Sequence, residues 1–542
     1  MKPVLIHNDQ YNIGHICTRQ QVEAGLGEKT AMRWITPALE RTDYTFLDLE
    51  RASNRAANML LGLGVQPGDR VFILLPRSPE LYFAYLGILK IQAVACSLFS
   101  NFGEDALLDR MGDAAARVLI TKKSFVRKIQ AIWPQLGGLE KVLVVDQAED
   151  QSERVLSYAS RIANASDEYT APLTGPEMPS VLHYTSGSTG KPKGVQHVHR
   201  AILTHAATFR GVFMAEDDDI FWCTADPGWV TGVTYGITAP WSQGITQVHY
   251  AGSYQAEAWM QVLERERVTL WYTAPTALRM MMQEDEAVLA SGDLSAVRHI
   301  FSVGEPLNPA VIDWGRRVLR HDIHDTWFQT ETGAIMITNR PGLPIRPGSM
   351  GKPFQLIEAA VLDDQGNPQP DGEQGRLCLK AGWPSMFVTY LNRVEAYSEK
   401  FRDGYYDSGD MAFRDADGYF WFVGRGDDVI NTAGHLVSPF EVESALLEIE
   451  EIGEAGVIAA PDPLLWEKVV AFVRLKSAVK WNRDLELKIR LHISNRVSSL
   501  ASPQDIRVVD SIPKNKSGKI MRRVLKAWYT GQEVGDLSTL ED

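Results

Sequence analysis

The chain has 542 residues, a length that corresponds to about three or four domain-sized units. Its 55 Lys and Arg against 68 Asp and Glu leave a net charge of −13, which disfavours a nucleic-acid coat or a protein of anionic membrane surfaces. Hydrophobic residues at 45% and charged residues at 23% are ordinary globular proportions and disfavour intrinsic disorder. The four cysteines stand far apart without CxxC spacing, so we expect no disulfide framework, no structural zinc site and a reduced, cytoplasmic setting.

The chain shows no segment typical of secretion or of membrane insertion. Its first residues, MKPVLIHNDQYN, contain no apolar run of signal-peptide length. The most apolar stretch, residues 81–99, is interrupted by Lys90 and Gln92, whereas a spanning helix needs roughly 20 apolar residues. We interpret this stretch as a buried helix followed by a strand and expect a soluble protein.

Residues 69–146 alternate between short apolar runs and segments of helical periodicity. The apolar runs are residues 70–75, 93–99, 117–121 and 141–145, and the helical segments are residues 79–91, 104–115 and 125–136. This alternation predicts crossover units and a mostly parallel sheet covered on both faces. Further buried strands are predicted at residues 220–224, 269–272 and 299–303. Ligands of open α/β sheets bind at the carboxyl ends of the strands, so the loops after these runs are the expected place for chemistry.

After Gly351 the composition changes to short strands with frequent turns, such as Asp371-Gly372 and Asp403-Gly404. From Pro439 a compact α+β pattern follows, with helices at residues 440–447 and 485–497, strands at 455–459 and 469–475, and a last helix from Lys519. The predicted fold class is therefore α/β. A large N-terminal domain, residues 1–425, contains parallel-sheet α/β subdomains and a β-rich subdomain, and a small α+β domain follows at residues 426–542.

The most informative segment is YTSGSTGKPKG at residues 184–194, between a strand-like VLHY and the segment VQHVHRAILTHAA, which we predict to be helical. Glycine amides, hydroxyl groups and two lysines together suit a polyphosphate. The segment is not a Walker A motif, because Lys191 is followed by Pro192 and not by Ser or Thr. Its phosphate-contacting residues are predicted to be Thr185, Ser186, Gly187, Ser188, Thr189, Gly190, Lys191 and Lys193.

This segment resembles the phosphate-binding signature of the adenylate-forming superfamily, which comprises acyl-CoA synthetases, luciferases and peptide-synthetase adenylation domains. The resemblance extends in order through GEP, DTWFQTETG, YDSGD, GRGDDVINTAG and PKNKSGK, at residues 304–306, 325–333, 406–410, 424–434 and 513–519. It implies a carboxylate that attacks the α-phosphorus of ATP with loss of pyrophosphate. Because both reactants are anions, the enzyme must supply positive charge, Mg²⁺ and alignment.

The resemblance also implies the roles of individual residues. Glu331 would hold Mg²⁺ and Thr330 would contact phosphate, although TETG by itself also suits a helix start. Asp410 would accept hydrogen bonds from both ribose hydroxyls, with Arg425 beside it at the ribose, although DSGD by itself also suits an exposed turn. The remaining nucleotide contacts implied are Gly304, Glu305, Pro306, Asp325, Thr326, Trp327 and Gln329, with Trp327 offering a flat face to adenine.

Lys519 resembles the catalytic lysine that the second domain of the superfamily brings to the carboxylate and the α-phosphate. Asp427 falls at the hinge of the superfamily, where a few backbone torsions would swing a mobile C-terminal domain between adenylation and thioester formation. An ordinary linker turn is the structural alternative at Asp427. A solvated loop is the alternative at Lys519.

Within the superfamily, CTADPGWVTG, YTAPTALR and SVGEPL resemble the acetyl-CoA synthetase branch. Carried over, the acyl pocket would be lined by Val230, Thr231, Val303 and Phe328. Phe328 departs from the branch, which usually has Trp there, so we expect acetate with propionate tolerated. CoA contacts are predicted at Tyr272, Ala274 and Gly434.

A second departure is Leu436, where relatives usually have Arg, because leucine cannot replace the bidentate phosphate contacts of a guanidinium group. The SPFEVE segment after it resembles medium-chain enzymes. A medium-chain or aryl-acid CoA ligase, an adenylation domain that loads a carrier protein, and a non-catalytic nucleotide sensor therefore remain as alternatives. The expected small molecules are a carboxylate, ATP, Mg²⁺ and CoA, with no nucleic-acid or membrane partner.

Overall fold

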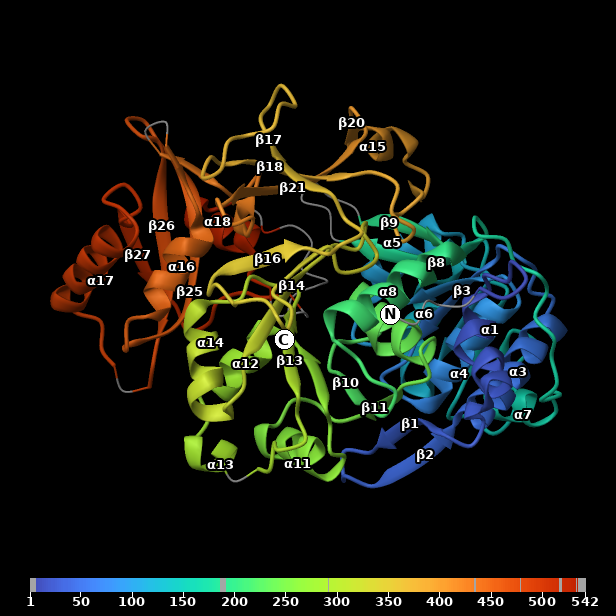
Figure 1. Ribbon diagram of the computed structural model, residues 1–542. Helices are drawn as coiled ribbons and strands as arrows, with labels where there is room; N and C mark the ends of the chain where they lie inside the picture. Colours follow the sequence, from blue (N-terminus) through green and yellow to red (C-terminus); the bar gives the residue numbers. More distant parts are fainter. Residues whose placement is uncertain are drawn as a thin grey trace.

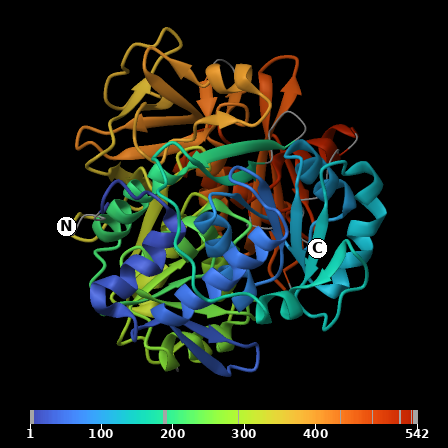
Figure 2. The ribbon, with the colours of Figure 1, turned by 90° about the vertical axis from the view of Figure 1, so that its right-hand side faces the viewer.

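The computed structural model describes residues 6–185, 192–290, 292–432, 435–477, 479–515, 519–532 and 534. Figures 1 and 2 show three layered parts: an N-terminal α/β part in blue and green, a second sheet that continues into a β-rich part, and a C-terminal part in red. In the described part of the chain, no helix is both long and apolar enough to cross a membrane.

The first sheet carries the predicted βα units. Its strands, in spatial order, are β19 (Thr389–Tyr390), β9 (Lys193–Val198), β8 (Pro179–Thr185), β4 (Val94–Ser97), β3 (Arg70–Leu74), β5 (Val118–Thr121), β6 (Lys141–Val144) and β7 (Val155–Ser157). Its helices are α1 (Ile13–Cys17), α2 (Arg19–Gln21), η1 (Val22–Leu26), α3 (Phe46–Gly62), α4 (Pro79–Lys90), α5 (Glu104–Asp113), α6 (Lys123–Ile132), η2 (Trp133–Gln135), α7 (Tyr158–Ala163), η3 (His199–Ala201) and α8 (Ile202–Val212). The strands from β8 to β7 are parallel, as predicted.

The helix prediction for the segment after the glycine-rich loop was wrong at its beginning. Residues 193–198 form β9, which pairs antiparallel with β8, and regular α-helix starts only at Ile202. Gly194 permits this close hairpin, because a Cβ at this position would lie 3.2 Å from side-chain atoms of Leu182, Tyr184 and Leu391. The loop therefore connects two strands of one hairpin.

Local sequence explains the α3–α4 pair. A capping box, in which Thr45 and Asp48 each bond the backbone of the other, starts α3, and Pro79 occupies the first turn of α4. Gly87 allows close packing, since a Cβ there would lie 2.7 Å from that of Ala56.

Lys90, which interrupts the apolar stretch in the sequence, is buried as an ion pair. Its Nζ lies 2.6 Å from Glu50 Oε2 and 2.6 Å from Asn54 Oδ1. Burial lowers the pKa of Lys90 to about 8, although Glu50 opposes the shift. The predicted order of buried helix and strand over residues 81–99 is confirmed by α4 and β4.

The second sheet places most of the predicted site. In spatial order it contains β17 (Ala359–Leu362), β18 (Gly375–Lys380), β21 (Tyr405–Arg414), β22 (Phe420–Arg425), β16 (Ser349–Pro353), β15 (Ile337–Thr338), β14 (Ile323–Trp327), β13 (His299–Val303), β12 (Leu270–Thr273), β10 (Ile220–Cys223), β11 (Thr246–Tyr250), β1 (Thr30–Ile35) and β2 (Arg41–Thr45), with β20 (Phe401–Arg402) beside β21. Its helices are α9 (Val230–Val233), η4 (Thr234–Thr238), α10 (Ala239–Trp241), α11 (Ala256–Arg265), α12 (Pro275–Met281), α13 (Glu286–Ala290), α14 (Pro309–Trp314), η5 (Gly315–Leu319) and α15 (Val394–Ser398). The strands from β11 to β14 are parallel and those from β14 to β17 antiparallel.

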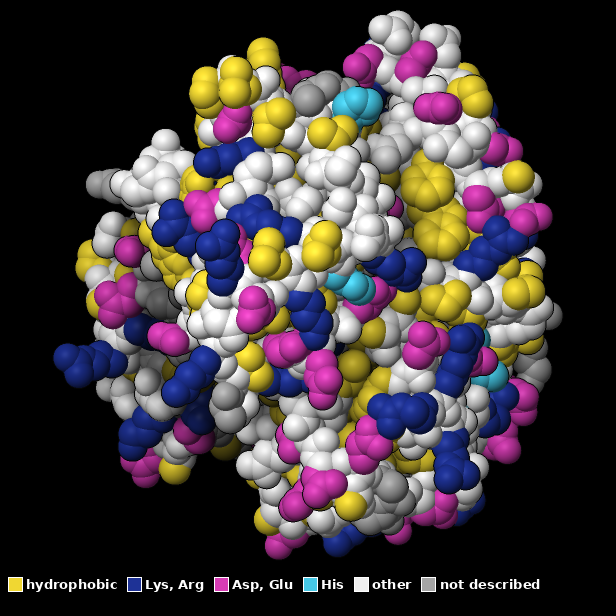
Figure 3. Space-filling model, turned by 90° about the vertical axis from the view of Figure 1, so that its left-hand side faces the viewer, with side chains coloured by type: hydrophobic (Ala, Val, Ile, Leu, Met, Phe, Trp, Pro, Cys, Tyr) yellow, Lys and Arg dark blue, Asp and Glu magenta, His cyan; other side chains and the backbone are white. Residues whose placement is uncertain are grey.

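The C-terminal part is an α+β unit, as predicted. Its strands are β24 (His435–Val437), β23 (Ile430–Thr432), β26 (Trp466–Leu475) and β25 (Ile452–Asp462), with β27 (Asp505–Val508) beside β26, and its helices are α16 (Pro439–Leu447), α17 (Arg483–Arg496) and α18 (Arg522–Thr530). The last helix starts at Arg522 and not at Lys519, because Lys514 and Ile520 pair in an antiparallel bridge just before it. On the face of the molecule that Figure 3 shows, Lys and Arg are interspersed with Asp and Glu.

Candidate active site

Asp410 lies at the centre of the predicted nucleotide site. It is 4% exposed and sits on β21, paired in register with Arg425 on β22. Arg425 Nη1 donates to Asp410 Oδ1 at 2.9 Å, while Trp327 Nε1 and Gln329 Nε2 donate to Oδ2 at 3.0 and 3.1 Å. Burial opposes the charge of Arg425, but Asp410 and Asp427 outweigh burial and raise the pKa of the guanidinium group. The structure thus brings together four predicted residues from three separate motifs.

The carboxyl group of Asp325 on the adjoining strand β14 could accept a hydrogen bond from a bound nucleotide. Asp325 is buried, and burial raises the pKa of its carboxyl group well above the usual value, against backbone bonds from Thr326 and Leu307. Its Oδ1 has no hydrogen-bond partner in the structure. A buried polar atom without a partner costs free energy until a ligand satisfies it. An amino group, such as that of adenine, would satisfy Asp325.

Glu305 is tied to protein side chains. Thr276 Oγ1 donates to its Oε1 at 2.5 Å, and Arg279 Nη2 lies 2.5 Å from its Oε2. The preceding Gly304 has φ +94°, a conformation that disfavours other residues. Pro306 follows in the same loop, and Asn308, two residues later, donates from Nδ2 to Ser444 Oγ of the C-terminal part at 2.7 Å. The GEP loop therefore lies where the two parts of the protein meet.

All four carbonyl groups of the loop at residues 330–333 accept hydrogen bonds from other parts of the chain. His197 Nε2 lies 2.8 Å from Thr330 O, and Phe387 N donates to Glu331 O at 2.9 Å. The carbonyl of Thr332 accepts hydrogen bonds from Trp383 Nε1 and Ser385 Oγ. The carbonyl of Gly333 accepts one from Thr234 Oγ1. Burial lowers the pKa of His197 to about 4, so the ring is neutral at pH 7.

Glu331 is suited to hold one metal ion. Its half-buried carboxylate accepts a 2.8 Å hydrogen bond from Tyr390 Oη at Oε1. Within the described residues, no group of three or more His, Cys, Asp and Glu could hold a metal by itself. Mg²⁺ is commonly bound by one or two carboxylates together with substrate phosphates and water, so a single glutamate beside a phosphate loop fits this ion. Sequence reasoning did not find Tyr390, for which no motif stood out.

The glycine-rich loop is described only at its two ends. Thr185 ends β8 and pairs with Lys193 at the start of β9, whereas residues 186–191, with the other predicted phosphate contacts, lie outside the described residues. Lys193 Nζ lies 5.2 Å from the centroid of the Tyr390 ring. This end of the loop therefore adjoins Glu331 through one tyrosine.

Lys519, in the C-terminal part, is influenced electrostatically by the Asp410–Arg425 pair. It is accessible to solvent, yet the surrounding protein desolvates its ammonium group and lowers its pKa. Arg425 lowers the pKa further, while Asp410 and Asp428 oppose the shift. Lys519 thus lies within electrostatic reach of the pair at the predicted ribose site. Asp427 lies in a tight turn after β22, in which Asp428 N and Val429 N both bond Arg425 O.

The residues predicted to line the acyl pocket lie at the ends of three elements, and one of them contacts an aromatic ring. Val230 and Thr231 begin α9, Val303 ends β13 and Phe328 follows β14. The Phe328 ring meets that of Tyr235 edge-on, with centroids 5.7 Å apart. Tyr235 is fully buried; its hydroxyl accepts from Ile335 N at 2.9 Å and lies 2.8 Å from Thr208 Oγ1. Tyr235 was missed in the sequence, where it reads as an ordinary core residue five positions after Val230.

Two of the three predicted CoA contacts, Tyr272 and Ala274, lie in the described part of the chain. The Tyr272 side chain is fully buried and its hydroxyl lies 2.8 Å from Thr326 Oγ1, which favours a packing role. Ala274 caps the N-terminus of α12 and is half-buried. Gly434 lies outside the described residues, and Leu436 on β24 is 43% exposed.

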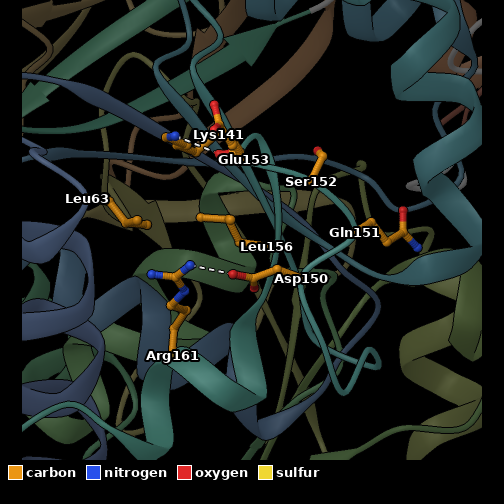
Figure 4. Close-up of a pocket in the computed structure, with 8 residues that line it drawn as sticks. All are labelled: Leu63, Lys141, Asp150, Gln151, Ser152, Glu153, Leu156 and Arg161. Atoms are coloured by element: carbon orange, nitrogen blue, oxygen red, sulfur yellow. Dashed lines mark hydrogen bonds and ion pairs between the residues drawn. The ribbon is translucent and has the colours of Figure 1, made fainter.

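One cavity lies apart from these contacts, and a second adjoins the 330–333 loop. A surface pocket of about 550 Å³ near β6 and β7 is lined by Leu63, Lys141, Asp150, Gln151, Ser152, Glu153, Leu156 and Arg161 (Figure 4). Arg161 pairs with Asp150 and Lys141 Nζ bonds Glu153 O there, so its charges satisfy one another. An enclosed cavity behind the 330–333 loop is lined by His183, His197, His205 and Val230 among others.

Comparison with known proteins shows the family of the chain. Residues 19–391 match the family described as AMP-binding enzyme, and residues 441–519 match its C-terminal domain, so the chain belongs to this family. Acetyl-coenzyme A synthetase of Bacillus subtilis (strain 168) is 47% identical, over 92% of this chain and 87% of the relative. That of Deinococcus radiodurans is 39% identical, over 98% and 86%. Among solved structures, the anthranilate CoA ligase AuaEII in complex with anthranoyl-AMP has a TM-score of 0.89 and 30% identity, over 98% of this chain and 99% of that chain.

Proposed function

We propose that this chain is an AMP-forming acyl-CoA synthetase that activates a short-chain carboxylate, acetate first and propionate next. The carboxylate attacks the α-phosphorus of ATP, and pyrophosphate leaves with the electron pair of the broken P–O bond. The thiol of CoA then attacks the acyl carbonyl of the adenylate, and AMP leaves. Curated relatives named acetyl-coenzyme A synthetase, 38–47% identical over 92–98% of the chain, support this assignment.

One observation carries the nucleotide part of the proposal: residues from distant segments meet around Asp410. Its buried carboxylate, fixed by Arg425 and Trp327, is a pure acceptor and suits the ribose hydroxyls. Glu331 would hold Mg²⁺, which would neutralise phosphate charge. The ammonium of Lys519 would stabilise the charge that develops on the reacting carboxylate and α-phosphate. The family match independently favours a nucleotide substrate.

We further propose that the chain divides at residues 425/426 and turns at Asp427 between the two half-reactions. The two family matches leave residues 392–440 between them, a range that includes this turn. Among the described residues, hydrogen bonds from Asn308 to Ser444 and from Arg474 to Gln283 cross between the parts, and the Phe422 ring meets that of Phe440. Domains joined by such contacts can rotate about a hinge. CoA would then enter past Ala274 and Gly434.

The proposed size of the acid follows from the aromatic pair behind the predicted acyl pocket. The Phe328 ring meets Tyr235 edge-on, and two hydrogen bonds fix Tyr235, so we propose that this pair limits the space beside Val230 and Val303. This closure favours acetate and propionate over medium-chain or aromatic acids. We place the enzyme in the cytoplasm, because its four cysteines are free and buried.

The test is pyrophosphate release from ATP with acetate, propionate, butyrate, hexanoate and benzoate, followed by loss of free CoA thiol. We expect both signals with acetate and propionate. Hexanoate or benzoate as the preferred acid would favour a medium-chain or aryl-acid ligase. Pyrophosphate release without loss of CoA thiol would instead favour loading of a carrier protein.

A further inference from the structure

Tyr390 connects two parts of the site that lie far apart in the sequence. It sits on β19, which pairs antiparallel with β9, so that Tyr390 lies opposite Val195, two residues after Lys193. The side chain is 1% exposed and packs against the ring of Phe387 at a tilt, with 4.9 Å between the ring centroids. Packing and strand pairing together fix the direction of the ring.

The hydroxyl group of Tyr390 is directed at Glu331. Tyr390 Oη lies 2.8 Å from Glu331 Oε1. A carboxylate can only accept a hydrogen bond, so the phenol O–H of Tyr390 is the donor. One carboxylate oxygen of Glu331 is thereby restrained, and the backbone of the same residue is held by Phe387 N at its carbonyl.

The ring of Tyr390 serves a different group. Lys193 Nζ lies 5.2 Å from the ring centroid, within the range of a cation–π contact. The main chain reinforces this placement, because Leu391 N donates to Gly194 O at 2.7 Å. One side chain thus contacts the ammonium group at the end of the glycine-rich loop with its face and Glu331 with its edge.

We propose that Tyr390 is a positioning residue that orients Glu331 for the metal ion of the metal–nucleotide substrate. This inference rests on the proposed function. A lone glutamate has freely rotating bonds, and a metal held by one protein carboxylate needs that carboxylate fixed in advance. Hydrogen bonds to a ligating carboxylate supply this restraint, and their loss typically costs 10- to 100-fold in metal affinity. The cation–π contact of the same side chain also aligns Lys193.

The decisive variant is Tyr390→Phe, which removes the hydroxyl and keeps the ring that contacts Lys193. Tyr419→Phe is the matched control, because Tyr419 is also buried, also donates its hydroxyl at 2.7 Å (to Pro344 O) and also has a lysine, Lys352, over its ring. Calorimetry measures the affinity for α,β-methylene ATP, which cannot release pyrophosphate, once with Mn²⁺ and once with EDTA. The ratio of the two affinities is the contribution of the metal.

We expect Tyr390→Phe to reduce this ratio about 10- to 100-fold and to leave the affinity in EDTA within twofold, while Tyr419→Phe changes neither. Thioester formation from preformed acetyl-adenylate and CoA should also stay within twofold, since the metal is not needed to break the bond to AMP. An unchanged ratio, or an equal loss with and without Mn²⁺, overturns the inference. The binding measurement needs no acid, so a failure of the wild type to activate any short-chain acid would overturn the proposed function alone.

Discussion

Replacement of Phe328 by Trp tests the shape of the acyl pocket. The Phe328 ring already lies edge-on to Tyr235 at a centroid distance of 5.7 Å. Tyr235 is fully buried and bonded at its hydroxyl to Ile335 N and Thr208 Oγ1, so it has no space into which to withdraw. In a close-packed interior, the additional volume of an indole must therefore come from the acyl pocket.

The magnitude follows from the one methylene that separates propionate from acetate. Such a group in a hydrophobic pocket is worth about 1–3 kcal/mol, or about 10- to 200-fold in kcat/KM. We expect Phe328→Trp to lower the ratio of kcat/KM for propionate over acetate by a factor in this range, measured by pyrophosphate release. Phe413→Trp is the control, because Phe413 is half-buried on β21 and stacks on Trp421, away from the pocket. A propionate-to-acetate ratio within twofold of the wild type in Phe328→Trp would refute the assignment.

Three further predictions concern charge. Asp410→Asn should raise the KM for ATP about 10- to 100-fold and change the KM for acetate little, because hydrogen bonds to a charged group are worth about 1.5–3 kcal/mol; an unchanged KM for ATP would contradict the ribose assignment. Lys519→Ala should lower ATP–pyrophosphate exchange at least about 100-fold and leave thioester formation from preformed adenylate within a few-fold; equal losses in both half-reactions would contradict it. The free energy of unfolding in urea should fall as pH drops from about 6.5 toward 4, because burial lowers the pKa of several histidines to about 3 or 4, and the unfolded chain takes up protons first. These are His183, His197, His199, His205, His249 and His324. The raised pKa of Asp325 acts in the opposite sense, and a free energy of unfolding that rises over this range would contradict the prediction.

The parts of the fold that the sequence predicted are those in which local pattern and packing agree. The βα units of residues 69–146 alternate regularly because each strand is buried on both faces and each helix covers it. The helix prediction failed for residues 195–198, which belong to β9. Pairing of β9 with β8, a contact across the glycine-rich loop, determined the structure there.

In the site, too, some contacts were predicted from the sequence and others were not. Motifs alone placed Asp410, Arg425, Trp327 and Gln329 near one another, and the structure joins these four by hydrogen bonds. No motif indicated that Glu305 is tied to Arg279 and Thr276, or that Tyr272 is sealed in the core. A motif gives residue types at a fixed spacing along the chain. It does not show which residues from distant segments contact a given side chain.

By itself, the sequence determined the fold class and the family resemblance and supplied the residues of the proposed nucleotide site, because these depend on residue types at fixed spacings within short segments. The tertiary structure alone decided the surroundings of that site: the tyrosine that bonds Glu331, the tyrosine that closes the space behind Phe328, and the neutral His197 under Thr330. The two residues of each contact are far apart in the sequence: 59 residues for Tyr390 and Glu331, more than 90 for Tyr235 and Phe328, and 133 for His197 and Thr330. Contacts at such separations depend on how whole sheets pack, and no local pattern encodes them.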